Sequence, residues 1–143
     1  ADISDYHERI AGFNSALQLK GIHDQKRIIQ APTNRQGGRE AFNKLIEESP
    51  NIQAFICFSD VIAYGAIEAM RQHGLVPGKD IKVVGFDDLA DSCLMQPALS
   101  SVRIDANDIG KRACQTLGEI LNKAQPAVRT LVDVSVQIRE SSL

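Results

Sequence analysis

The strongest constraint in the sequence is the alternation of short apolar runs with longer segments of helical periodicity. Residues 54–58 and 81–86 are continuous apolar runs of strand length. Such runs are typical of parallel strands that are buried on both faces. Three further stretches have the length and composition of short strands: 27–30, 99–104 and 131–138. We expect the last stretch to form two short strands.

Amphipathic helices are expected between these strands, because apolar residues recur three and four positions apart. The expected helices span 5–20, 37–49, 60–72 and 105–121. The last one places its apolar side chains on a single face, which we expect to lie in the core: Ile109, Ala113, Leu117, Ile120 and Leu121. Since strands and helices alternate, we predict an α/β fold, with a doubly wound, mostly parallel sheet and helices on both faces.

Length and charge narrow the class of protein. The 143 residues are close to the size of one domain, and 43% of them are hydrophobic, which is enough for a sizeable core. With 16 basic and 18 acidic residues the net charge is −2, so the chain lacks the overall basic surface that would hold a phosphate backbone. No apolar run approaches the roughly 20 residues that cross a bilayer. Three widely spaced cysteines favour the reducing cytoplasm over a secretory compartment.

Signatures of catalysis and of cofactor binding are missing from the sequence. It contains no glycine-rich dinucleotide fingerprint, no phosphate-binding loop and no Gly-x-Ser-x-Gly nucleophile motif. The three histidines, His7, His23 and His73, lack the spacing of metal ligands. We therefore expect a binding protein that is not an enzyme and that needs neither a cofactor nor a metal.

Polar residues follow three of the expected strands. In parallel α/β sheets, ligands bind outside the carboxyl ends of the strands, so Ser59, Asp60, Asp87 and Asp105 are expected to share one edge. Asp60 and Asp105 stand where a helix N-cap is wanted, and we favour capping over ligand contact for both. For Asp87 a ligand contact and a role in a turn are equally compatible with the sequence.

Two helices carry side chains that their apolar stripes leave unexplained. Arg9 borders the apolar stripe of its helix, where its guanidinium can reach a pocket. It would otherwise be an ordinary surface arginine. Tyr64 falls among charged residues on the outer side of the 60–72 helix, and Leu94 and Met95 are apolar residues in an expected loop. These three form a candidate self-association surface, although a single surface tyrosine is common.

Several segments together resemble the lactose-repressor (LacI/GalR) family of bacterial transcription regulators. The Arg-x-x-Gly-Phe helix, the Ser-Asp strand-to-helix step, the Gly-Phe-Asp-Asp strand end and the Pro-x-Leu-Ser-Ser-Val segment occur in the family's order and spacing. The segments concerned are 9–13, 58–66, 83–88 and 97–102, together with Gly110 and the closing 139–141.

The resemblance implies an effector-sensing and dimerisation part of a ligand-controlled repressor. On this interpretation, residues 1–143 are the C-terminal portion of the effector domain, mostly its C-terminal lobe, with about 1–20 from the end of the N-terminal lobe. The DNA-binding headpiece would be absent, so operator DNA would be bound only through that missing part. The partners implied are a small sugar-like effector and a second copy of the chain, with no membrane.

The family's pocket, carried over residue by residue, gives a set of expected ligand contacts. Arg9 and Asp87 would hold the effector from opposite lobes, with Ser59 and Asp5 lining the same pocket. Gln36 stands near a position that is often aromatic, and Ile104 where a polar side chain is frequent, so both depart from the family pattern. The alternative is a periplasmic sugar-binding protein of the same fold, used in transport or chemotaxis.

Overall fold

The computed structural model describes residues 4–22, 28–122 and 130–143, with side chains from Tyr6 onward. The described residues form a four-stranded sheet of order β1-β2-β3-β4. Its strands are β1 (Ala54–Ile56), β2 (Lys82–Asp87), β3 (Ser100–Ile104) and β4 (Val134–Gln137). The first three strands are parallel, whereas β4 runs antiparallel to β3. The mostly parallel α/β sheet expected from the sequence is therefore confirmed.

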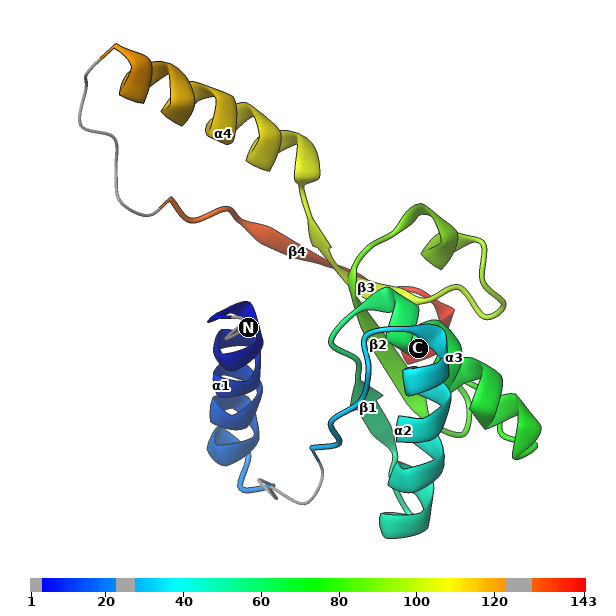
Figure 1. Ribbon diagram of the computed structural model, residues 1–143. Helices are drawn as coiled ribbons and strands as arrows, with labels where there is room; N and C mark the ends of the chain where they lie inside the picture. The colour runs from blue at the N-terminus through cyan, green and yellow to red at the C-terminus, as the bar shows by residue number, and fades with distance from the viewer. Residues whose placement is uncertain (1–3, 23–27, 123–129) are drawn as a thin grey trace.

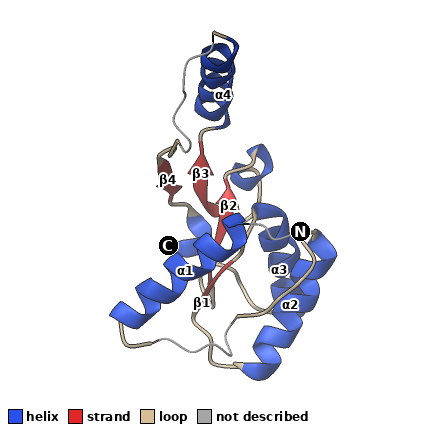
Figure 2. Ribbon diagram, turned by 60° about the vertical axis from the view of Figure 1, so that its left-hand side comes forward, coloured by secondary structure: helices blue, strands red, loops and turns tan. Residues whose placement is uncertain are grey.

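The described residues contain four α-helices: α1 (Ser4–Leu19), α2 (Arg35–Glu48), α3 (Asp60–Gln72) and α4 (Ala106–Leu121). They also contain two short 3-10 helices, η2 (Ala90–Cys93) and η3 (Glu140–Ser142). Figures 1 and 2 show α1 on one side of the strands, with α2 and α3 on the other. Helices thus lie on both faces of the sheet, as expected. All four helices fall within a few residues of the segments that the sequence indicated.

The core lies between α2, α3 and the sheet. Phe42 of α2, Ile67 and Met70 of α3, Val83 of β2 and Leu99 are all at most 1% exposed. Helices α2 and α3 can pack closely because Gly65 has no side chain. A Cβ at this position would lie 1.9 Å from the carbonyl oxygen of Arg35. Cys57 is buried among these residues as well, and burial raises the pKa of its thiol to about 12.

Three of the expected strand regions differ from the structure. Residues 28–30 form no strand, and residue 27 lies outside the described part of the chain. The expected strand over 54–58 is shortened to Ala54–Ile56, and Ile56 is 57% exposed because β1 is an edge strand of the described sheet. The region 131–138 forms one strand, β4, where two were expected.

Helix α4 contradicts the expectation that its apolar face lies in the core. None of its residues is buried, and Leu117, Ile120 and Leu121 are more than half exposed. Figures 1 and 2 show the helix extending away from the sheet, beyond the end of β3 and the start of β4. The periodicity correctly predicted an amphipathic helix, but periodicity does not reveal whether a neighbouring element covers the apolar face.

Candidate functional site

The carboxyl ends of β1 and β2 carry a compact group of charged and aromatic side chains. It consists of Arg9, Phe58, Phe86 and Asp87, and is called here the Arg9–Asp87 cluster. Phe86 and Asp87 end β2, and Phe58 follows β1. Val83 and Gly85 of β2 point into the core, so the alternation along the strand sends Phe86 to the opposite face, the side on which α1 lies.

Arg9 reaches this edge of the sheet from α1. Its Nη1 donates a hydrogen bond to the carbonyl oxygen of Phe58 at 2.8 Å. The guanidinium carbon lies 4.4 Å from the centre of the Phe58 ring and 3.7 Å from that of Phe86. Both distances are within the range of cation–π attraction. The ring of Tyr6 also packs against Phe58, at 5.8 Å between centres, so two side chains of α1 contact the end of β1.

Asp87 completes the cluster as a partly desolvated carboxylate. Its Oδ1 lies 4.0 Å from Nη2 of Arg9, and their side chains are 35% and 24% exposed. That separation exceeds a direct hydrogen bond but fits a hydroxyl group or a water between the two. Burial raises the pKa of Asp87, an effect that Arg9 counteracts and that the charge of Asp60 increases.

Asp60 is a different kind of residue from the helix cap that the sequence suggested. The N-cap of α3 is Ser59, whose Oγ accepts from the backbone N–H of Ile62 at 3.5 Å. Asp60 is fully buried, and its carboxylate accepts from Leu89 N at 2.8 Å, Ser92 Oγ at 2.5 Å and Ser101 Oγ at 2.6 Å. The prediction of a cap at Asp60 was wrong, because its side chain turns into the protein to hold the loop that follows β2.

The cap predicted at Asp105 is confirmed. Its side chain accepts from the backbone N–H groups of Asn107 and Asp108 at the start of α4. Ser59 directly follows Phe58 of the Arg9–Asp87 cluster and is half-buried, which places it beside the cluster in the chain.

The other expected ligand contacts are not brought into the cluster by any contact in the described residues. Gln36 is exposed in the first turn of α2, where it bonds to Arg39 and Glu40 of its own helix. Ile104 ends β3 and pairs with Val134 of β4. Asp5 belongs to α1, and its side chain lies outside the described part of the structure.

Tyr64 is not on the outer surface, and this prediction was wrong. It is 2% exposed, and its hydroxyl shares a hydrogen bond of 2.8 Å with Ser92 Oγ of η2. The helical wheel identified the side of α3 on which Tyr64 lies, but not that the 89–95 loop covers that side. Of the loop residues, Leu94 is 77% exposed, whereas Met95 is partly buried against the core.

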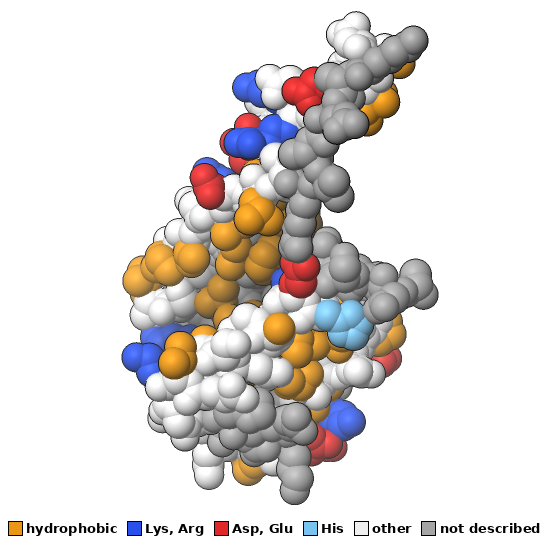
Figure 3. Space-filling view, turned by 90° about the vertical axis from the view of Figure 1, so that its left-hand side faces the viewer, with side chains coloured by type: hydrophobic (Ala, Val, Ile, Leu, Met, Phe, Trp, Pro, Cys, Tyr) orange, Lys and Arg blue, Asp and Glu red, His pale blue; other side chains and the backbone are white. Residues whose placement is uncertain are grey.

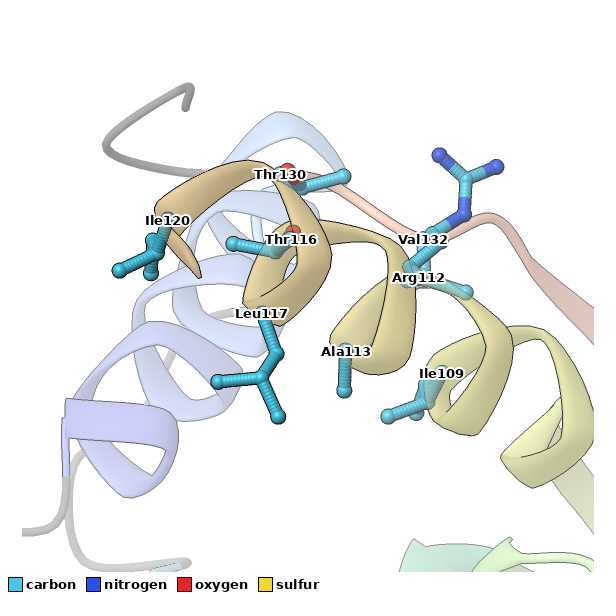
Figure 4. Close-up of a pocket in the computed structure, with 8 residues that line it drawn as sticks. All are labelled: Ile109, Arg112, Ala113, Thr116, Leu117, Ile120, Thr130 and Val132. Carbon is cyan, nitrogen blue, oxygen red and sulfur yellow. The ribbon is translucent and has the colours of Figure 1, made fainter. Parts of the chain in front are cut away.

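A separate hollow of about 430 Å³ lies along α4, where Ile109, Ala113 and Leu117 project from the same side of the helix (Figure 4). Ile120 and Val132 extend its apolar lining. The lining of this hollow is mostly apolar and offers few hydrogen-bonding groups to a polar ligand. The Arg9–Asp87 cluster is therefore the better candidate site. No group of three or more His, Cys, Asp or Glu side chains within the described ranges could hold a metal. None of the helices described is long and apolar enough to cross a membrane.

Comparisons with known proteins show which family this chain resembles. Residues 2–142 match the family of periplasmic binding protein-like domains. The chain is 30% identical over 135 residues to the ribose operon repressor of Haemophilus influenzae, covering 93% of this chain and 41% of the relative. It is also 30% identical over 151 residues to the HTH-type transcriptional regulator GalR of Escherichia coli, covering 98% and 44%. The chain thus spans less than half the length of these relatives.

Solved structures give the same result. The transcriptional repressor ascG of Escherichia coli superimposes with a TM-score of 0.84 at 28% identity, over 94% of this chain and 49% of that one. A lactose complex of a LacI-family regulator from Arthrobacter superimposes with a TM-score of 0.72 at 27% identity, over 78% and 43%. These matches confirm the resemblance to the lactose-repressor regulators, and the chain belongs to the family of periplasmic binding protein-like domains.

Proposed function

We propose that this chain is the effector-sensing part of a bacterial ligand-controlled transcription regulator, a repressor that binds a small sugar-like molecule at the Arg9–Asp87 cluster. The observation that carries the proposal is the meeting of a guanidinium and a carboxylate 4.0 Å apart at the carboxyl ends of parallel strands. This is the edge at which α/β sheets bind small ligands.

The chemistry of the cluster suits a ligand with many hydroxyl groups. A sugar hydroxyl both donates and accepts, so one hydroxyl can accept from Arg9 and donate to Asp87. Buried polar groups of a ligand need such partners. Ser59, beside the cluster, adds a further hydroxyl, and we extend the pocket to Gln36, Ile104 and Asp5 as residues that a bound ligand or a closed form of the full protein would bring closer.

The relatives favour a sugar over other polar metabolites. One is a ribose operon repressor, and one solved relative is a complex with lactose. Because the relatives named above are transcription regulators, we favour a repressor over the periplasmic transport protein, and a non-enzymatic, cytoplasmic role. Operator DNA would be bound through an N-terminal headpiece and not through residues 1–143, in agreement with their net charge of −2.

Self-association is the second part of the proposal. A repressor that reads a two-fold operator acts as a homodimer, and the same surface then serves both copies. We place this surface at the 89–95 loop, where Leu94 is exposed and Met95 lies beside it. Tyr64 supports the loop from beneath through Ser92 and is not itself available to a partner.

The test is a binding screen by isothermal titration calorimetry with ribose, galactose, lactose and cellobiose as probes. The proposal expects saturable binding of at least one of them, with a stoichiometry of one per chain. A protein that is folded by circular dichroism and binds none of these sugars, nor their phosphorylated forms, would contradict sugar sensing.

A further inference from the structure

The two residues that end β2 have an unusual backbone. Asp87 has φ 104° and Asp88 has φ 53°, both in the left-handed region that side chains other than glycine rarely adopt. A strained conformation of this kind persists only where its surroundings hold it in place. Since Asp87 is the carboxylate of the candidate site, whatever holds this backbone also sets where that carboxylate points.

Asp88 is held by two arginines. Its side chain is 3% exposed, and its Oδ2 accepts from Nε of Arg103 at 2.6 Å, while its Oδ1 faces Nη2 of Arg139 at 2.7 Å. Burial alone raises the pKa of a carboxyl, but the bonds to Arg139 and Arg103 outweigh it and lower the pKa of Asp88. The carboxylate of Asp88 is thus ionised, paired with two arginines and almost completely buried.

Hydrogen bonds from two backbone N–H groups also fix the chain at Asp88. The N–H of Asp88 donates to Ser101 Oγ at 3.0 Å, and Ser101 Oγ donates to the buried Asp60. The next N–H, that of Leu89, donates to Asp60 directly at 2.8 Å. Arg103 lies opposite Asp87 in the register between β2 and β3. The ion pair between Arg103 and Asp88 therefore links β3 to the residue that follows β2.

The adjacent acids therefore have different tasks. Asp88 has two cations on its two oxygens, whereas Asp87 faces Arg9 at the longer distance of 4.0 Å. We propose that Asp88 is a positioning residue: its ion pairs with Arg103 and Arg139 hold the left-handed turn that directs Asp87 toward Arg9 and leaves the carboxylate of Asp87 for a ligand. That Asp87 is left for a ligand rests on the proposed function. That Asp88 directs Asp87 toward Arg9 does not depend on it.

The sign of a titration separates positioning from simple electrostatics. Removing a cation raises the pKa of a nearby carboxylate that stays in place. If Arg103 or Arg139 instead holds Asp87 in its partly buried position, its loss releases Asp87 to solvent. The pKa of Asp87, raised by burial, then falls toward its ordinary value of 3.8. The two explanations thus predict opposite directions.

The experiment is an NMR titration of the Asp87 side-chain carboxyl in the wild type, Arg103→Met and Arg139→Met, with Arg71→Met at the far end of α3 as the matched control. We expect the pKa of Asp87 to fall in both arginine variants and to stay unchanged in the Arg71→Met control. A rise or an unchanged pKa in folded Arg103→Met would overturn the proposal. Arg103 is 52% exposed, so this variant is expected to fold even if Arg139→Met does not.

A second arm uses the sugar from the ribose, galactose, lactose and cellobiose panel that binds the wild type. Its dissociation constant is expected to increase about tenfold in Arg103→Met and to be unchanged in Arg71→Met, because a misdirected Asp87 loses about one hydrogen bond to the ligand. Unchanged affinity in Arg103→Met would also overturn the proposal. If neither these sugars nor their phosphorylated forms bind, the proposed function fails, whereas the NMR titration still decides the role of Asp88.

Discussion

Arg9 of α1 and Asp87 at the end of β2 lie 4.0 Å apart, and the guanidinium of Arg9 lies over the rings of both Phe58 and Phe86. The two aromatic rings limit where the guanidinium can move, so the donors of Arg9 are held in place before any ligand arrives. Preorganisation of this kind lowers the entropic cost of binding. It also explains why a half-exposed helix such as α1 has a fixed point of contact with the sheet.

Asp60 is expected to be the residue of this edge on which folding depends most. Asp60→Ala leaves the hydroxyls of Ser92 and Ser101 and the N–H of Leu89 without their buried acceptor, so it should lower the free energy of unfolding by about 3 kcal/mol. Urea unfolding followed by circular dichroism measures the loss. Asp105→Ala, which removes an exposed helix cap, is the control and should cost much less. Equal losses in the two variants would contradict the role given to Asp60.

Gly85 is expected to accept no side chain. A Cβ at this position would lie 2.1 Å from Oδ1 of Asp60, so Gly85→Ala should destabilise the protein by about 2 kcal/mol. Gly110 in α4 has nothing within 4 Å of its Cβ position, and Gly110→Ala should raise helix stability by up to about 1 kcal/mol. Thermal melts of both variants test the pair. If Gly85→Ala melted at or above the wild-type temperature, the close contact with Asp60 would be wrong.

The stability contributed by Asp88 should depend on pH. The pKa of Asp88 is lower in the folded protein than its ordinary value of 3.8, so the ionised carboxylate stabilises the fold above that value. This contribution is lost as the pH falls below 3.8 toward the folded pKa. Wild type and Asp88→Asn should differ clearly in urea midpoint at pH 7, and the difference should shrink as the pH falls below 3.8. A difference that stayed constant over this range would rule out the ionised form as the stabilising one.

The 89–95 loop is expected to mediate self-association through Leu94. Leu94→Asp should produce monomers in sedimentation experiments, because a carboxylate at the centre of an interface loses its water without gaining a partner. Leu19 on α1 is even more exposed than Leu94, so Leu19→Asp is the control and should leave the oligomeric state unchanged. If both variants sediment as the wild type does, the interface lies elsewhere.

The sequence predicted the meeting of Arg9 and Asp87 better than it predicted which side chains are exposed. Asp87 and Arg9 were identified because strand ends and the border of a helical stripe are local features, and the topology of a parallel sheet then brings strand ends together. Tyr64 was assigned to the outside because a helical wheel contains no information about a loop that folds over it. Asp60 resembled a cap, since local spacing cannot show that a side chain turns toward residues far along the chain.

The apolar face of α4 illustrates the same limit. Its stripe predicted burial, yet the helix extends from the sheet with its leucines and isoleucines exposed. Figure 3 shows that hydrophobic side chains are also exposed on the face of the molecule below this helix. Burial depends on which other elements lie against a face, and this is a property of the tertiary structure that one segment cannot encode.

The measurement that tests the central claim most directly is calorimetry with a sugar that binds the wild type, repeated with Arg9→Ala and Asp87→Asn. Asparagine tolerates a left-handed backbone, so Asp87→Asn removes the charge with little added strain. If the Arg9–Asp87 cluster holds the sugar, each variant should fold and bind it about ten- to a hundredfold more weakly, whereas Arg71→Ala should bind normally. Wild-type affinity in both folded cluster variants would show that the ligand binds elsewhere.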